Sequence, residues 1–332
     1  MPGFTAHYIF GVEMYHKITD PSIKKMIKQN LGPYRFGLQG PDLFFYNPFH
    51  VLYSDDRNIG KLMHETKVSQ FFRNYLNLAE KLRNASDRAT ALSYFYGFVC
   101  HYTLDTIIHP YVYDRSDYVP DDERSAKDSF SMHTYIEGLM DTILLNDHFG
   151  KKPSKFHQTR TLSLSKREYQ LLSALMVKAV NLTYFNGKKE ERIYQTHRFS
   201  LLLSILSIKL GTWILHDKVG IKKKLTNFLE KRFMEEVVVS HLIGLDYYDD
   251  SIDANNKSKA LWKNPWDTSI TSNKSVSELM DDAAIKFVDY EAVLKSYAIA
   301  MLSKDKKVRR EKKEALLTTL GNLSYHSGLP CE

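Results

Sequence analysis

Histidine and carboxylate side chains recur at four-residue intervals in two segments of the chain. His101, Asp105 and His109 form the first series, and His133 and Glu137 form the second. Residues four apart lie on one face of an α-helix, and imidazole and carboxylate groups are typical ligands of zinc. The spacing therefore predicts a metal site built from the faces of two helices.

The separation of His101 and His109 indicates more than one metal ion. Eight residues of a standard helix rise about 12 Å, so one ion could hardly bind both rings without straining the helix. Asp105 lies midway and has two oxygens that can bind separate ions. This favours a multinuclear site bridged by Asp105, an arrangement that stabilises attacking and leaving oxygens in phosphoryl displacement. The alternative is a helix that buries these polar groups only for packing.

Long helices must position these residues. Glycine and proline number only 15 and 10 among 332 residues, which argues against a many-stranded fold. Pro110 is expected to end the helix that carries His101, and no β-hairpin is predicted. Apolar residues spaced by three and four predict helices over residues 60–83, 125–148, 165–185, 191–216, 219–243 and 276–303. A further helix is predicted to begin at a cap within residues 84–87 and to run through Ala91 to about Ile108. The predicted fold is all-α, a multi-helix bundle with the metal cluster between its helices.

Composition and charge exclude several classes of protein. Apolar residues at 43% and charged residues at 26% exclude disordered and fibrous chains. The two cysteines are too few for a disulfide framework or a four-thiolate zinc site. A net charge of +7 permits contact with phosphates or an anionic membrane without demanding it.

The chain is expected to be organised as one domain over residues 1–303, followed by a basic segment over 304–332. Residues 304–313 are predicted to form a solvent-exposed helix. The N-terminus lacks the basic region of a signal peptide, and the longest apolar stretch, 200–215, is too short to span roughly 30 Å of hydrocarbon. These features predict a soluble, cytoplasmic protein.

Five short motifs follow one another in the first 137 residues. They are 6–11 (AHYIFG), 40–42 (GPD), 60–65 (GKLMHE), His101-x3-Asp105-x3-His109-Pro110 and His133-x3-Glu137. Their order and relative spacing over residues 7–137 resemble the zinc-dependent phospholipase C family and, more distantly, the zinc-dependent single-strand nucleases. Residues 262–266, which include two tryptophans and a proline, resemble a later segment of that family.

The resemblance implies three metal positions and two or three zinc ions. The first position would use Asp42, His64, His101 and Asp105. The second would use His109, His133 and Glu137. The third would use His7 and the shared Asp105, together with an N-terminal amine that the family usually takes from a tryptophan. Such a tryptophan is missing here, and the amine of Pro2, exposed by removal of Met1, is the candidate replacement.

The resemblance also implies a function. It predicts phospholipase C-like hydrolysis of a phospholipid, at a membrane surface, or of a related phosphodiester, by zinc-activated hydroxide. Asp42 would orient or deprotonate the water, and Asp105 would be the second catalytic residue. The four-residue step from Asp105 to His109 is similar to the zinc domain of glycosylphosphatidylinositol-specific phospholipase D, which leaves open the ester bond that is cut. The alternatives are a single-strand nuclease and a non-catalytic helical protein with structural zinc.

The remaining histidines and aromatic residues have weaker signals. His50 is expected at the rim of the site, and His16 either supports His7 or lies on the surface. His326 has no partner at ligand spacing and is interpreted as structural or exposed. The aromatic segments 44–53 and 111–118 either line a substrate cleft or belong to the core.

Overall fold

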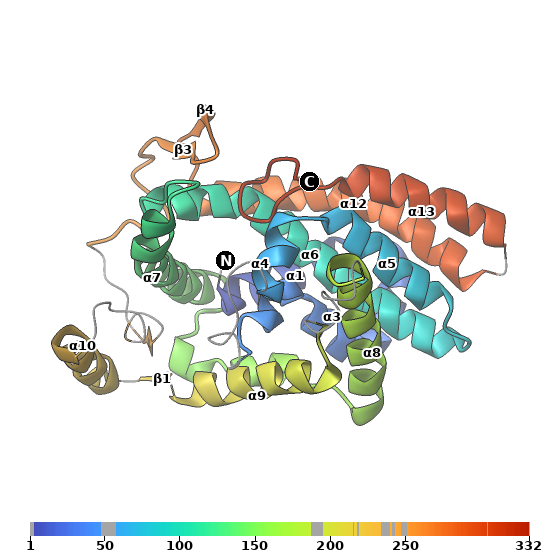
Figure 1. Ribbon diagram of the computed structural model, residues 1–332, viewed down its shortest axis with the longest axis horizontal. Helices are drawn as coiled ribbons and strands as arrows, with labels where there is room; N and C mark the ends of the chain where they lie inside the picture. The colour runs from blue at the N-terminus through green and yellow to red at the C-terminus, as the bar shows by residue number, and fades with distance from the viewer. Residues whose placement is uncertain are drawn as a thin grey trace.

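Helices make up most of the chain that the structure describes (Figure 1). A computed structural model describes residues 3–47, 58–186, 195–214, 216–217, 219–233, 240, 243–246, 251–303 and 305–331. Strands within these residues are limited to two short pairs. The predicted all-α class is therefore confirmed.

Helix α6 (Ala85–Arg115) is the central element of the fold (Figure 1). It contacts α1 (Phe4–Lys17), α3 (Leu31–Gly37), α7 (Glu123–Phe149) and α12 (Val276–Leu302). From Thr90 to Val112 every residue except Ile107 is buried. A helix surrounded in this way is normally apolar on all faces. The buried histidines and aspartate of α6 are therefore exceptions that call for a role.

Helix α6 continues past Pro110, so the predicted end at residue 108 is wrong. Proline lacks an amide hydrogen and cannot donate to the carbonyl of Thr106, one turn earlier. Tertiary packing compensates, because Ile108, His109, Pro110 and Tyr111 are all buried. The extension places Tyr113 and Asp114 one turn beyond the metal-binding motif.

The predicted helix over 60–83 is divided in two. Helix α4 (Ile59–Glu65) ends before Lys67, which has a left-handed backbone with φ of 52°, and α5 (Val68–Glu80) follows. The break leaves the carbonyl of His64 free of a helical partner, and it accepts a hydrogen bond from the amide of Tyr325 at 2.8 Å. A contact between distant segments thus accompanies the end of α4.

The other helices surround α6 or extend beyond it (Figure 1). Helices α9 and α10 are shorter than the predicted ranges 191–216 and 219–243, parts of which lie outside the described residues. The remaining helical elements are α2 (Pro21–Gln29), η1 (Gly40–Phe44), η4 (Pro153–Lys155), η5 (Gln158–Leu162), α8 (Lys166–Tyr184), α9 (Arg198–Ile214), α10 (Ile221–Phe233) and α13 (Lys306–Leu320).

Two short strand pairs interrupt the helices. β1 (His216–Asp217) pairs in parallel with β2 (Gly244–Leu245). β3 (Trp262–Asn264) pairs antiparallel with β4 (Asp267–Ser272), in a segment for which no hairpin was predicted. Distant contacts hold this hairpin in place, since the amide of Lys263 donates to Asp114 Oδ1 at 3.0 Å. Its turn lacks the Asn-Gly or Asp-Gly pair that marks most tight hairpins.

The C-terminal part of the chain packs on the helices that precede it. Helix α13 packs against α12 and α5 and forms an ion pair between Arg73 and Glu314. The final loop, residues 321–331, then returns to the centre of the fold (Figure 1). The division at residue 303 stays a prediction, although described residues on both sides of it are in contact. Among the described residues, no helix combines the length and hydrophobicity that a membrane span needs; the cytoplasmic location stays a prediction.

Candidate metal centre

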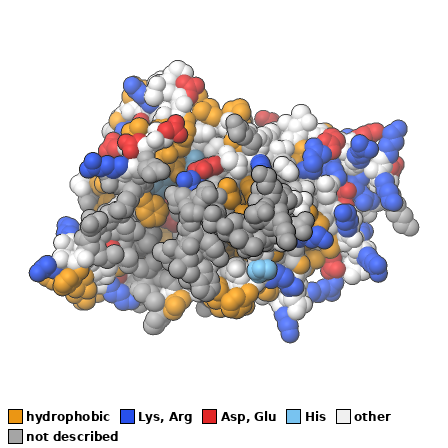
Figure 2. All heavy atoms as spheres, viewed as in Figure 1, with side chains coloured by type: hydrophobic (Ala, Val, Ile, Leu, Met, Phe, Trp, Pro, Cys, Tyr) orange, Lys and Arg blue, Asp and Glu red, His pale blue; other side chains and the backbone are white. Residues whose placement is uncertain are grey.

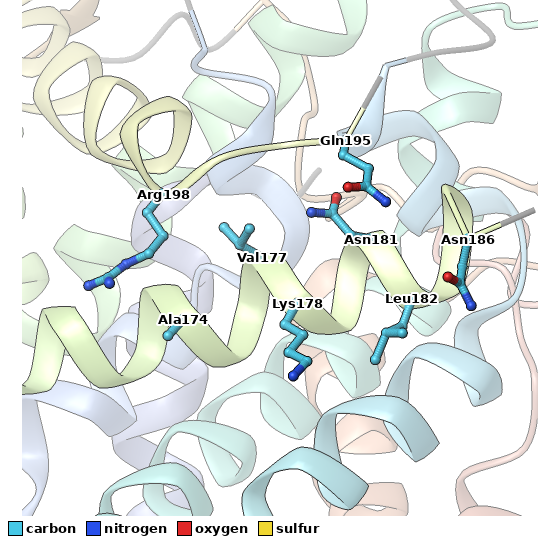
Figure 3. A pocket seen from close by; sticks show the side chains of 8 residues that line it. All are labelled: Ala174, Val177, Lys178, Asn181, Leu182, Asn186, Gln195 and Arg198. Carbon is cyan, nitrogen blue, oxygen red and sulfur yellow. The ribbon is translucent and has the colours of Figure 1, made fainter. Parts of the chain in front are cut away.

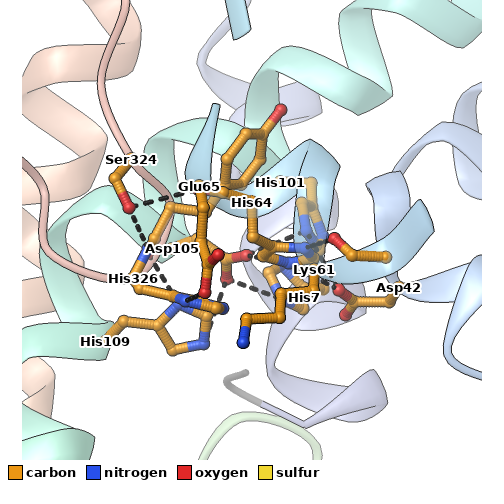
Figure 4. Close-up of polar contacts among 12 residues, drawn as sticks. His7, Asp42, Lys61, His64, Glu65, His101, Asp105, His109, Ser324 and His326 are labelled. Carbon is orange, nitrogen blue, oxygen red and sulfur yellow. Dashed lines mark hydrogen bonds and ion pairs between the residues drawn. The ribbon is translucent and has the colours of Figure 1, made fainter. Parts of the chain in front are cut away.

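Four buried side chains from three elements converge beside α6 (Figure 4). They are Asp42 from η1, His64 from α4, and His101 and Asp105 from α6, and their candidate ligand atoms all lie within 4.8 Å of one another. Nε2 of His64 lies 3.2 Å from Asp42 Oδ1, and Nε2 of His101 lies 2.9 Å from Asp105 Oδ2. We refer to these four residues as the first group.

A second group lies between α6 and α7. Its members are His109, His133 and Glu137, all buried, with candidate ligand atoms again within 4.8 Å of one another. Glu137 Oε1 lies 2.9 Å from Nε2 of His133 and 3.9 Å from Nε2 of His109. The two groups contain the seven residues expected for the first two metal positions.

Asp105 faces both groups, as the helical spacing predicts. Its Oδ2 points to His101 and, at 3.7 Å, to Nε2 of His64. Its Oδ1 lies 3.9 Å from Nε2 of His109 and 3.1 Å from Nε2 of His7. A single fully buried carboxylate therefore stands among four imidazoles.

His7 belongs to this cluster through α1. Its ring stacks on that of His101 with 3.9 Å between centroids. Asp141 of α7 fixes the start of α1, because its two carboxylate oxygens accept the amides of Thr5 and Ala6 at 2.9 and 2.8 Å. Pro2, the candidate amine ligand, lies outside the described residues.

Backbone carbonyls orient the histidine rings. Nδ1 of His64, His101 and His109 lies 2.6, 3.0 and 2.7 Å from the carbonyl oxygens of Gly60, Leu38 and Tyr325, respectively. Each Nδ1 thus donates to a carbonyl, which leaves Nε2 as the ring nitrogen that faces the carboxylates and is available to a metal ion. Metal-binding histidines in proteins are held in the same way.

The turn that carries Asp42 depends on a glycine. Gly40 has a φ of 46°, and a Cβ at this position would collide with the ring of His101. The turn can therefore approach α6 closely enough for Leu38 to accept the hydrogen bond from His101 and for Asp42 to face His64.

The donor atoms fit a bound cation. Within the described structure, Nε2 of His64, His101 and His109, Oδ1 of Asp42 and both oxygens of Asp105 are buried without a hydrogen-bond partner. Buried polar atoms are nearly always satisfied, because leaving them unpaired costs free energy. The mixed imidazole and carboxylate donors match the preferences of zinc.

Comparison with protein families identifies the chain. The model of the zinc-dependent phospholipase C family matches residues 7–194, more than half of the sequence. The chain belongs to the zinc-dependent phospholipase C family. The comparison with curated proteins gave no match, and neither did the comparison with solved structures. Family membership and the buried donor groups together support a metal-dependent phosphodiesterase.

The family match includes every expected side-chain ligand, from His7 to Glu137, and ends before residue 262. The likeness of residues 262–266 to a later segment of the zinc-dependent phospholipases C therefore stays a prediction.

The electrostatics of this phospholipase-family site favour a cation between the groups. Burial alone would raise the pKa of Asp105, but the imidazoles of His101, His109 and His7 hold it well below its usual range. Burial opposes charge on His64, yet the carboxylates of Asp105 and Asp42 raise its pKa to about 9. Without a metal ion to balance the carboxylates, the first group therefore keeps a proton on His64. A bound metal ion would displace this proton.

The second group behaves differently. Burial lowers the pKa of His109 and His133 well below the usual range. Both rings are therefore neutral at pH 7, the form in which histidine binds metal. No proton has to leave these two rings before a metal binds.

His326, which sequence spacing leaves as structural or exposed, lies beside both groups. Its ring stacks on that of His64 with 5.1 Å between centroids, and its Nδ1 lies 3.5 Å from Glu65 Oε1. The centroid distance to His109 is 5.8 Å. Burial lowers the pKa of His326 to about 4. Sequence spacing could not reveal this residue, because its neighbours lie more than 200 positions earlier in the chain.

Aromatic side chains form one side of the second group. Tyr113 packs against His133 and Trp266 with centroid distances of 4.5 and 4.9 Å, and Tyr118 lies 5.1 Å from Trp266. Tyr111, by contrast, is a core residue. The segment 111–118 therefore contributes both to the core and to the surroundings of the site. We call Tyr113, Tyr118 and Trp266 the aromatic wall.

The segment 44–53 is described only in part. Phe44 is buried in the core, and Phe45 contacts the ring of His64 at 5.1 Å. His50 lies outside the described residues. His16 is exposed at the end of α1. It therefore lies on the surface and does not support His7.

A cavity of about 360 Å³ lies elsewhere, along α8 (Figure 3). Its lining contains no histidine or carboxylate, so it is separate from both groups. The lining residues are Ala174, Val177, Lys178, Asn181, Leu182, Asn186, Gln195 and Arg198.

Proposed function

We propose that this protein hydrolyses a phospholipid, or a closely related phosphodiester, with zinc ions held by the first and second groups. The observation that carries the proposal is the position of Asp105, whose two oxygens face different groups. A purely structural zinc site is closed by four protein ligands, whereas the second group offers only three, His109, His133 and Glu137. A carboxylate shared between neighbouring groups instead suits a reaction in which negative charge develops at adjacent oxygens.

The geometry supports an assignment of residues to each metal position. Asp42, His64, His101 and Asp105 would hold one ion, and His109, His133 and Glu137 would hold another. His7 and Asp105 are the candidate ligands of a third. When bound, zinc lowers the pKa of water from 15.7 toward about 7 and stabilises negative charge on phosphoryl oxygens.

Asp42 is the best placed residue to orient the attacking water and accept its proton. Its side chain is 6% exposed, whereas that of Asp105 is fully buried. Its Oδ1 lies 3.2 Å from Nε2 of His64 and 3.5 Å from Nε2 of His101. A carboxylate held in this way can receive a proton from the face of the site that substrate reaches.

A single-strand nuclease is the second candidate function. The aromatic wall favours it, because aromatic side chains next to a phosphodiester-binding site can stack nucleobases. The same wall can also contact the glycerol backbone or the headgroup of a lipid. The two functions are therefore distinguished by which substrate the protein cleaves, a lipid or single-stranded DNA.

A substrate screen on the zinc-loaded protein tests the proposal. Phosphatidylcholine, phosphatidylinositol and single-stranded DNA are offered in parallel, and the lipid products are identified. We expect diacylglycerol from a lipid substrate, whereas phosphatidate would indicate cleavage on the other side of phosphorus. His133→Ala should lower turnover, and His148→Ala should not, because His148 lies at the surface in an ion pair with Glu13. A folded protein with bound zinc that cleaves none of these substrates would contradict the proposal.

A further inference from the structure

Helix α10 presents its apolar side chains to solvent. Five large hydrophobic residues of this helix are between 44% and 74% exposed. They are Ile221, Leu225, Phe228, Leu229 and Phe233. Helices on the surface of globular proteins normally bury such residues against the core.

The polar face of α10 is the one that contacts the protein. Glu230 is the buried residue of the helix, and its Oε2 accepts the amide of Ser240 at 2.9 Å. Lys223, two turns before Glu230 on the same face, has its Nζ 4.8 Å from the ring centroid of Tyr135 in α7. The helix is thus anchored through charged side chains, and its hydrophobic face points outward.

Positive charge accompanies the exposed hydrophobic face. Lys222, Lys224, Lys231 and Arg232 are all exposed, whereas the one acidic residue of α10 is the buried Glu230. Hydrophobic and basic side chains lie together at the lower left of Figure 2, where Figure 1 places α10. The surface that α10 offers is both hydrophobic and cationic.

We propose that α10 docks the protein on an anionic lipid surface. Such a surface supplies phosphate and carboxylate groups for the lysines and an acyl region for Phe228 and its neighbours. A second copy of this chain would bring another cationic surface, since its net charge is +7. The inference goes beyond the proposed function, because docking would occur whichever phosphodiester the metal centre cleaves.

The neighbouring helix extends the hydrophobic surface. Phe199, Leu206 and Leu210 of α9 are 51% to 64% exposed, and Val219 in the connection to α10 is 68% exposed. Helices α9 and α10 both lie along the lower edge of Figure 1. Side chains from two successive helices are therefore available to an interface larger than one helix.

Vesicle sedimentation tests the proposal with the zinc-loaded full chain. We expect binding to vesicles that contain phosphatidylserine, weaker binding to pure phosphatidylcholine, and loss of binding as salt is raised. The double substitution Leu225→Glu/Phe228→Glu should reduce the partition coefficient by about tenfold or more. Lys222→Glu/Lys224→Glu should remove the preference for phosphatidylserine.

Two controls carry the same chemical changes outside α10. Ile285→Glu on α12 replaces a residue that is 67% exposed, and Lys306→Glu/Lys307→Glu on α13 reverses two exposed charges. Both should bind vesicles as the wild type does. All substituted positions are exposed, so circular dichroism should show an unchanged fold.

Three results of the vesicle assay would overturn the proposal. The first is failure of the wild type to bind anionic vesicles. The second is binding by the Leu225→Glu/Phe228→Glu variant that equals binding by the wild type. The third is a loss of binding in the Ile285→Glu control as large as the loss in that double variant. A wild-type dimer that this double substitution dissociates would assign α10 to a second copy and would also overturn it. Docking and catalysis remain distinguishable, because vesicle binding without lipid hydrolysis would contradict only the proposed function. Hydrolysis of a soluble substrate without vesicle binding would contradict only the docking.

Discussion

Replacement of Asp105 by asparagine tests the shared carboxylate most directly. The substitution preserves the size of the side chain and removes its charge. Asparagine and aspartate have similar helix propensities, so α6 should remain intact. Since four imidazole nitrogens lie within 3.9 Å of the Asp105 oxygens, the change reaches both groups at once.

The magnitude follows from the distances. Oδ2 and Oδ1 face the first and second groups at 2.9 and 3.9 Å. Unit charges about 4 Å apart at an effective dielectric constant near 20 interact by about 4 kcal/mol. Each 1.36 kcal/mol is a factor of about ten, so the affinity of each group should fall by about 10³ for a singly charged ion and by more for zinc, which carries two charges. We expect loss of at least one zinc ion and a fall in turnover of about three orders of magnitude or more.

Elemental analysis and turnover of a chromogenic phosphodiester measure the two effects, and circular dichroism shows whether the variant is folded. His133→Ala is the matched control, because His133 belongs to the second group alone. It should affect metal content and rate less than Asp105→Asn does. A folded Asp105→Asn protein with full zinc content and near-normal turnover would refute the bridging role.

Four further outcomes are expected. Chelation should abolish turnover, and zinc should restore it; activity that survives in metal-free protein would count against the site. Gly328→Ala should lower the free energy of unfolding by more than about 1–2 kcal/mol, because the added Cβ would collide with the carbonyl of Thr106. Gly321 also has a positive φ, but a Cβ there would meet no neighbouring atom, so Gly321→Ala is the control. Thermal unfolding of the two variants measures the difference. Burial raises the pKa of Asp141 from 3.8 to about 6. Protonation of this carboxyl therefore stabilises the folded state at low pH, and the stabilisation is lost as the pH rises through about 6. Asp141→Asn should therefore destabilise metal-free protein more near about pH 4 than at about pH 7, and an equal effect at both would contradict that pKa. His326→Ala should keep the full zinc content and cost about 1 kcal/mol of stability from lost ring contacts; loss of an ion would instead make His326 a ligand.

The sequence by itself determined the features that depend on neighbours one or two turns away. The four-residue spacing of His101, Asp105 and His109 places them on one face of a helix wherever that helix lies, because helical geometry is local. The same periodicity predicted most helices and the all-α class. Asp42, His64 and His7 have no regular sequence spacing from the residues of α6, so only the family resemblance indicated them as ligands. The structure brings all three beside Asp105.

Local signals failed where distant contacts changed the outcome. Pro110 is a strong helix breaker in isolation, but burial on all sides keeps α6 helical beyond it. Residues 60–83 have continuous periodicity, yet the pairing of Tyr325 with the His64 carbonyl accompanies a break after α4. In both places, tertiary contacts stabilise a backbone conformation that the local sequence disfavours.

Only the tertiary structure decided which surfaces meet. His326 and Tyr325 reach the metal centre from the last residues of the chain, where no ligand spacing exists to reveal them. The amphipathic pattern of α10 is visible in the sequence, but a pattern cannot tell which face will be buried. In this fold the charged face found partners in Ser240 and Tyr135, and the hydrophobic face was left to solvent. Burial is a property of the whole packed chain, and periodicity reports only how residues are divided between two faces.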